Sequence, residues 1–136
     1  MGKGLTAAMP TYSFVIPVLN EEEVLPELHR RLDAVAAKLD GRAEFVLVDD
    51  ASTDRSRELM LEMRERDQRV KLLFLSRNFG HQLAISAGLD YASGDAVVIM
   101  DADLQDPPEV ALEMAALWRE GWRPASSVRP RVSSTA

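Results

Sequence analysis

The chain has 136 residues, enough for one domain with a substantial core. Its formal net charge of -6 argues against a nucleic-acid partner, because phosphate backbones are bound by basic faces. The absence of cysteine excludes disulfides, thiolate zinc sites and cysteine nucleophiles. Hydrophobic residues make up 46% and charged residues 28%, the balance of a folded globular protein.

No segment reaches the roughly 20 apolar residues of a membrane helix, and the N-terminus lacks the apolar core of a signal peptide. We therefore expect a soluble, cytoplasmic chain. Residues 1–11 are expected to be disordered or frayed, and residues 12–121 to form the folded unit. Residues 122–136 are expected to be an irregular tail, because they contain two prolines, four serines and no strand pattern.

Four apolar segments alternate with four segments of helical periodicity. The expected strands are residues 12–18, 44–48, 70–75 and 96–100, and a helix follows each of them. The cores of these strand segments are apolar rather than alternating, which is typical of a parallel sheet covered by helices on both faces. The sequence therefore predicts an α/β fold, in which ligands bind outside the carboxyl ends of the strands.

Two of the expected helices begin with capping signals. Asn20 precedes the first helix, and Glu23 follows three residues later as in a capping box. Asp106 precedes Pro107, and proline is favoured at the first helical position because its missing N–H is not needed there. We expect Asn20 and Asp106 to cap these two helices.

Asp101 and Asp103 form an Asp-x-Asp motif where the fourth expected strand ends. Alternate residues of an extended segment point the same way, so both carboxylates can reach one cation, with Gln105 as a possible third oxygen ligand. Oxygen ligands without cysteine favour Mg²⁺ or Mn²⁺. A solvated loop would also accommodate these residues, and the metal interpretation depends on their position at a strand end.

Polar residues also follow the other three strands, and each group admits two interpretations. Asp49 and Asp50 are consistent with a turn before a helix, or one of them accepts hydrogen bonds from a ribose or base. Glu21 lies in a first helical turn, where the helix dipole alone favours an anion. Arg77 and Gly80 precede a helix start that can hold a phosphate, although Arg77 can also pair with a nearby carboxylate.

His81 is as consistent with a polar surface position as with a functional one. It follows Gly80 directly, at the expected start of the third helix. The sequence leaves both interpretations of this histidine open.

Four stretches at matching spacing resemble the inverting family two glycosyltransferases of the GT-A fold. The resemblance is to the polyprenyl-phosphate branch, which comprises dolichyl-phosphate mannose synthases and bacterial undecaprenyl-phosphate sugar transferases. The stretches are FVIPVLNEEEVLPEL, FVLVDDASTDRS, LSRNFGHQLAISAGLDYASGD and VVIMDADLQDPPE. They cover nearly all of the chain from Tyr12 to about Gly121 and imply a Rossmann-like nucleotide-sugar-binding half-domain.

The resemblance also implies roles for particular residues. Asp101 and Asp103 would be catalytic and, with Gln105, would hold the Mg²⁺ or Mn²⁺ that bridges the diphosphate of a nucleotide sugar. The implied substrate-binding residues are Pro17, Asn20 and Glu21 in the nucleotide pocket, Asp50 with Asp49 at the base or ribose, and Arg77 and Gly80 near the donor.

The implied reaction transfers a sugar from a UDP- or GDP-sugar to an undecaprenyl or dolichyl phosphate, with inversion. Full-length relatives continue past this length with acceptor-binding segments, and they are membrane-associated on the cytoplasmic side. The alternative is therefore an inactive nucleotide-sugar-binding fragment without the acceptor half. Contact with a membrane surface would come only through the acceptor or the missing C-terminal segments.

A phospho-receiver domain is a third possibility, because it too is a doubly wound sheet with acidic strand ends. It needs an acidic pair after the first strand and an aspartate after the third. This chain has Asn20 and Glu21 at the first of these places and Arg77 and Asn78 at the second, so the sequence argues against a receiver.

Overall fold

The computed structural model describes residues 9–105, 107–121 and 131–133. They form a parallel sheet with the strand order β3-β2-β1-β4-β5. The strands are β1 (Thr11–Val18), β2 (Arg42–Asp49), β3 (Val70–Phe74), β4 (Ala96–Ile99) and β5 (Arg131–Ser133). The helices are α1 (Leu25–Lys38), α2 (Ser56–Arg66), α3 (His81–Tyr91) and α4 (Val110–Arg119). The predicted α/β alternation is confirmed.

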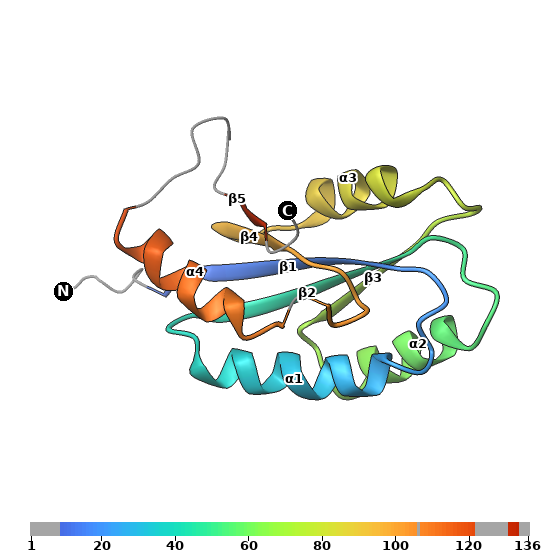
Figure 1. Cartoon of the computed structure of the whole chain (residues 1–136), viewed down its shortest axis with the longest axis horizontal. Helices are drawn as coiled ribbons and strands as arrows, with labels where there is room; N and C mark the ends of the chain where they lie inside the picture. The colour runs from blue at the N-terminus through green and yellow to red at the C-terminus, as the bar shows by residue number, and fades with distance from the viewer. Residues whose placement is uncertain (1–8, 106, 122–130, 134–136) are drawn as a thin grey trace.

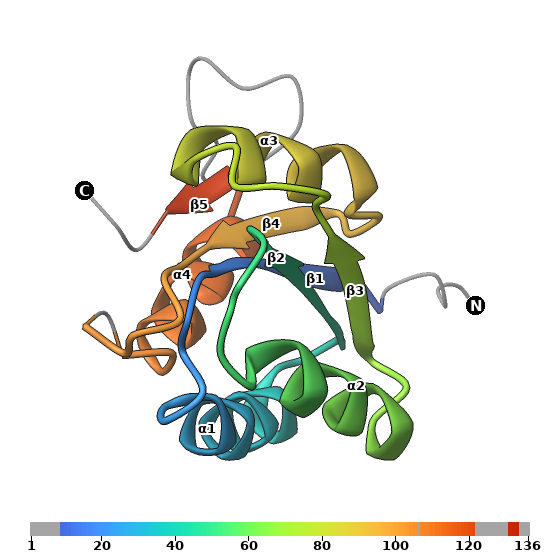
Figure 2. The same cartoon turned by 90° about the vertical axis from the view of Figure 1, so that its right-hand side faces the viewer.

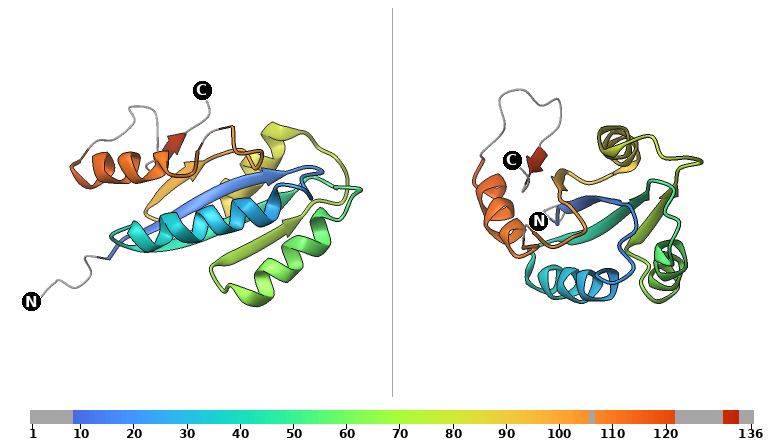
Figure 3. Two further views of the ribbon diagram at one scale, coloured as in Figure 1. Left: turned by 60° about the horizontal axis from the view of Figure 1, so that its bottom comes forward. Right: turned by 45° about the vertical axis from the view of Figure 1, so that its right-hand side comes forward.

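Helices cover both faces of this sheet (Figure 1). α3 lies on one face, whereas α1 and α2 lie side by side on the opposite face (Figures 2 and 3). Successive residues of β1 enter different cores: Phe14 and Ile16 pack with the α1, α2 and α4 side chains, and Val15 packs with those of α3. Burial on both faces explains why the cores of the strands are continuous apolar runs.

α3 lies very close to the sheet because of a glycine. A Cβ atom at Gly88 would lie 2.5 Å from Val15 Cγ1, which is too close, and 3.0 Å from Val48 Cγ2, which is a tight contact. Ala84 on the same face of the helix is fully buried. Small residues on this face therefore set the distance between α3 and the sheet.

The predicted capping box at Asn20 is wrong. α1 begins at Leu25, with Val24 in the N-cap position and no side-chain hydrogen bond at that cap. Asn20 instead adopts φ 54°, in the left-handed region that asparagine tolerates, and its side chain bonds to the loop after β2. α4 begins at Val110 rather than at Pro107, and the expected cap Asp106 lies outside the described residues.

The expected irregular tail contains a strand. Arg131–Ser133 pair in parallel with β4, Val98 being opposite Val132. A strand of three residues is too short for its pattern to be recognised in sequence, and β4 would otherwise leave its outer backbone edge unpaired. The rest of residues 122–136, and residues 1–8 of the expected frayed N-terminus, lie outside the described part. Within that part, no helix is long and apolar enough to cross a membrane.

Candidate functional site

A cavity of about 230 Å³ opens where β1, β2 and β4 end. Its polar lining consists of four carboxylates and one imidazole, from Glu21, Asp50, Asp101, Asp103 and His81. Its apolar lining is Pro17, Val18, Leu19, Ala84 and Ala102. Segments far apart in the sequence therefore contribute to one site at the carboxyl edge of the sheet, as expected for a parallel α/β fold.

The segment after β4 directs two carboxylates into this cavity. Ala102 is 2% exposed and packs into the core, while Asp101 and Asp103 on either side of it line the cavity. The backbone then turns at Leu104, which has φ 64°, and the Gln105 N–H donates to Asp103 Oδ1 at 3.2 Å. Gln105 itself is exposed and does not line the cavity.

Asp50 is 3% exposed, and backbone groups already occupy both of its carboxylate oxygens. Oδ1 accepts the Phe79 N–H at 2.8 Å, and Oδ2 accepts the Gly80 N–H at 3.0 Å. Gly80 has φ 102°, a conformation that favours glycine. Asp50 therefore holds the loop that leads into α3, at the edge of the cavity.

Asp49 does not line the cavity, because neighbouring residues of a strand point to opposite sides. It is fully buried, and Arg57 Nε donates to its Oδ2 at 2.6 Å. The same guanidinium donates to the Leu75 carbonyl at 2.9 Å. Asp49 thus connects α2 to the ends of β2 and β3.

The loops after β1 and β2 bind each other at this edge. The Asn20 N–H donates to Ser52 Oγ at 2.9 Å, and Asn20 Oδ1 accepts the Thr53 N–H at 2.8 Å. The Glu21 N–H donates to Ser56 Oγ at 2.8 Å. Asn20 therefore fixes the backbone beside Glu21 and does not itself line the cavity.

Negative charge is concentrated in the cavity. Burial raises the pKa of Glu21, and the nearby carboxylates of Asp103, Asp54 and Asp101 raise it further. No lysine or arginine belongs to the part of the cavity wall that the structure describes. The one nitrogen-bearing side chain there is His81, whose Nε2 lies 3.4 Å from Asp101 Oδ1. The carboxylates of this described lining would repel a bound phosphate unless a cation lay between them.

Arg77 lies outside the cavity. It is exposed, and its guanidinium carbon lies 4.3 Å from the centre of the Phe79 ring. This is the geometry of a cation–π contact rather than of the phosphate contact or carboxylate pairing that the sequence suggests.

Of the four carboxylates that line the cavity, those of Asp101 and Asp103 come from one short segment after β4 and are the two that the sequence predicts as metal ligands. Within residues 9–105 and 107–121, no group of three or more His, Asp or Glu side chains is arranged to hold a metal ion. A hard divalent cation suits two carboxylates, but its remaining oxygen ligands would have to come from water or from a bound substrate.

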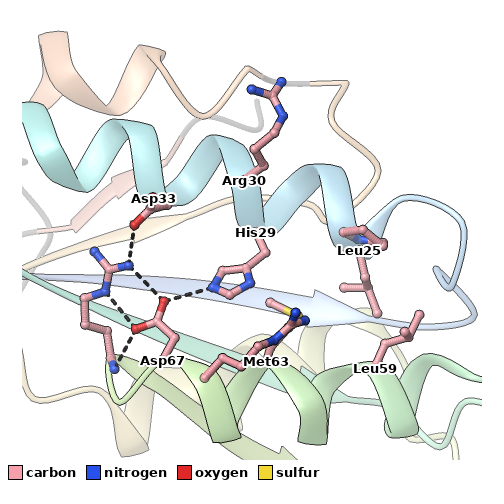
Figure 4. Close-up of a pocket in the computed structure, with 10 residues that line it drawn as sticks. Leu25, His29, Arg30, Asp33, Leu59, Met63 and Asp67 are labelled. Carbon is pink, nitrogen blue, oxygen red and sulfur yellow. Dashed lines mark hydrogen bonds and ion pairs between the residues drawn. The ribbon is translucent and has the colours of Figure 1, made fainter.

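A larger cavity of about 490 Å³ lies between α1 and α2 (Figure 4). Its polar side chains already bind one another: Arg69 donates to Asp67 and to Asp33, and His29 Nε2 lies 2.9 Å from Asp67 Oδ2. The hydrogen bonds from Arg69 and His29 hold the pKa of Asp67 well below its usual range. We interpret this cluster as a structural connection and take the smaller cavity as the candidate functional site.

The model of the family "Glycosyl transferase family 2" matches residues 13–134. The chain belongs to this family. It is 50% identical over 120 residues to an uncharacterized glycosyltransferase, YkcC, of Bacillus subtilis, covering 88% of this chain and 37% of that protein. It is 43% identical over 124 residues to an undecaprenyl-phosphate 4-deoxy-4-formamido-L-arabinose transferase of Salmonella paratyphi A, covering 90% and 38% respectively. The family 2 chain thus spans less than two-fifths of the length of these relatives.

Solved structures agree with this assignment. The S. aureus TarS 1-349 structure in complex with UDP superposes with a TM-score of 0.67 at 27% identity, over 81% of this chain and 32% of that one. A mannosyltransferase of Pyrobaculum calidifontis, in complex with GDP-Man and Mn²⁺, gives 0.64 at 28% identity, over 80% and 32%. The predicted GT-A fold and the glycosyltransferase classification are confirmed.

Proposed function

We propose that this family 2 chain is the donor-binding part of a glycosyltransferase that acts on a polyprenyl phosphate. The donor would be a UDP- or GDP-sugar, bound with Mg²⁺ or Mn²⁺, and transfer would invert the anomeric carbon. The observation that carries the proposal is the cavity at the carboxyl edge of the sheet, where Glu21, Asp101 and Asp103 meet.

Charge supports a metal-dependent donor. A nucleoside diphosphate is anionic, and so are these three side chains, so the two would repel each other without a cation between them. Asp101 and Asp103 are the residues that would hold this cation, which would stabilise charge on the leaving diphosphate. Gln105 would join them only through a change in the loop that follows Asp103.

The acceptor chemistry is consistent with such a site. A phosphate oxygen of the acceptor would attack the anomeric carbon, and the bond from that carbon to the diphosphate oxygen would break on the opposite face. This produces inversion and releases the nucleoside diphosphate. The acceptor phosphate is already ionised at neutral pH, so the reaction does not require a general base from this chain.

The relatives support both substrates. One curated relative is named as an undecaprenyl-phosphate transferase, and two structural neighbours were solved with UDP and with GDP-Man. The chain spans 38% of the length of the first of these. The second candidate function is therefore a nucleotide-sugar-binding fragment that does not turn over by itself.

Calorimetric titration of UDP and of GDP, with and without Mn²⁺, tests the proposal. We expect binding that requires Mn²⁺ and that falls at least about tenfold in Asp103→Ala, since one of two carboxylate ligands is lost. Binding that ignores both the metal and the substitution would contradict the proposal. Metal-dependent binding without product from undecaprenyl phosphate and sugar nucleotides would select the second candidate.

A further inference from the structure

Few of the side chains that line the described cavity can donate a hydrogen bond to a phosphate. Phosphate oxygens accept hydrogen bonds, and carboxylates also only accept. Of the side chains that line the described cavity, five are apolar and four are carboxylates. His81 is the remaining one, and an imidazole carries an N–H in either tautomer.

Asp50 determines where His81 lies. By accepting the Phe79 and Gly80 N–H groups, this buried carboxylate fixes the two residues that precede the histidine. Gly80, with φ 102°, then turns the chain into α3, and His81 is the first residue of the helix. The backbone of His81 is therefore held in place before any ligand binds.

The imidazole itself remains available. Its Nε2 lies 3.4 Å from Asp101 Oδ1, which is longer than a good hydrogen bond, and the side chain is 54% exposed. A ligand could thus engage the ring without breaking a strong internal contact. The ring also lies beside a carboxylate that we propose as a metal ligand, which is where the donor diphosphate would lie.

We propose that His81 donates a hydrogen bond to a phosphate oxygen of the donor's diphosphate and is the phosphate-contacting side chain of this site. The inference rests on the proposed function, because it needs a nucleotide in this cavity. The sequence alone is consistent with His81 as either a polar surface residue or a functional residue, and this inference selects the functional role.

Two substitutions separate the hydrogen bond from the shape of the ring. His81→Phe keeps an aromatic ring and removes both nitrogens, whereas His81→Gln keeps a side-chain N–H donor. Gln82→Ala is the matched control, because Gln82 is the next residue of α3, is exposed and does not line the cavity. The full chain is used throughout, with Mn²⁺, and thermal unfolding confirms that each variant is folded.

The measurement compares a nucleoside with its diphosphate, uridine with UDP and guanosine with GDP, using calorimetry for the diphosphates and NMR titration for the weaker nucleosides. We expect His81→Phe to weaken diphosphate binding about 10- to 100-fold, the effect of losing a hydrogen bond to a charged group, and to change nucleoside binding less than about twofold. His81→Gln should recover most of the loss, and Gln82→Ala should match the unsubstituted protein.

Unchanged UDP and GDP binding in His81→Phe would remove His81 from the phosphate site and leave the proposed function intact. An equal loss of nucleoside and diphosphate binding would assign the histidine a structural role only. If the unsubstituted chain binds neither UDP nor GDP with Mn²⁺, the proposed function fails and this inference fails with it.

Discussion

The side-chain oxygen of Asn20 accepts the backbone N–H of Thr53 at 2.8 Å, and that contact joins the loop after β1 to the loop after β2. The same oxygen accepts the Asp54 N–H at 3.2 Å. An asparagine that sequence assigns to a helix cap and a nucleotide pocket therefore connects two loops at the edge of the candidate site.

Substitution of Asn20 can separate this bridge from its unusual backbone conformation. Asn20→Gly tolerates φ 54° but has no acceptor, and we expect it to lower the free energy of unfolding by about 1 kcal/mol. Asn20→Ala should cost about 2 kcal/mol, because alanine is also strained in the left-handed region. Urea denaturation measures both, with the exposed Asn78→Ala as the control. Equal stability of Asn20→Gly and the unsubstituted chain would show that the bridge contributes nothing.

Removal of the Arg57 side chain should destabilise the protein strongly. Asp49 is fully buried, and Arg57→Ala would leave its carboxylate without the cation that lies 2.6 Å away. We expect a loss of about 2–4 kcal/mol in the free energy of unfolding. Arg55→Ala is the matched control, because Arg55 pairs at 3.6 Å with Glu58 on an exposed surface and should cost less than about 0.5 kcal/mol. A small effect of Arg57→Ala would argue against the structural role of Asp49.

The ion pair of Asp67 and Arg69 should make the free energy of unfolding depend on pH in the acid range. The folded-state pKa of Asp67 is depressed by the hydrogen bonds from Arg69 and His29. Its stabilising contribution is therefore present above the unfolded pKa of about 3.9 and is lost as the pH falls toward the folded pKa. Asp67→Asn should cost about 1–3 kcal/mol at pH 7.

The same difference should shrink below about pH 4, where the unfolded carboxylate of the parent chain takes up its proton. This pH dependence can be measured from the denaturant midpoints of the two proteins between pH 7 and pH 3. Asp33→Asn is the control, because the Asp33 side chain is 69% exposed, and its loss should matter little at any pH. A constant difference across the range would contradict the assigned role of the Asp67 charge.

Ionisation of Glu21 should lower the stability of the metal-free protein, whereas ionisation of Asp67 raises it. Burial and the neighbouring carboxylates raise its pKa in the folded state, so ionisation of Glu21 lowers stability as the pH rises through that range. Glu21→Gln should therefore gain stability at pH 7, by less than about 1 kcal/mol, and gain none below the unfolded pKa of about 4.3. Thermal melts in EDTA at pH 7 and at pH 3.5 compare the two proteins. A loss of stability at pH 7 would show that the carboxylate is held by favourable contacts instead.

The sheet could be predicted from local pattern because burial on both faces leaves a continuous apolar run in each long strand, as in residues 14–16 of β1. The meeting of Glu21, Asp101 and Asp103 at one edge follows from parallel strands ending together. The pairing of Asn20 with Thr53, and of Asp49 with Arg57, could not be predicted in the same way. Both pairings depend on the path of the loop between β2 and α2, and hydrophobic periodicity contains no information about that path.

The adjacent residues Asp49 and Asp50 also show what the sequence pattern alone cannot predict. Alternation requires that two adjacent carboxylates point to different sides, but it does not say which one faces the cavity. Which carboxylate faces the cavity depends on the loop between β3 and α3, where the backbone N–H groups of Phe79 and Gly80 donate to Asp50. The nucleotide-binding roles expected for Asp50 and Asn20 remain predictions.

The absence of a side chain at Gly88 lets α3, which carries His81 and Ala84 of the cavity wall, lie close to the sheet. α3 contacts β1 and β2 at this residue, so we expect an added methyl group to push the helix away from the sheet. His81 would then rise away from Asp101. A substitution at Gly88 would thus change the affinity for a substrate, although this residue does not line the cavity.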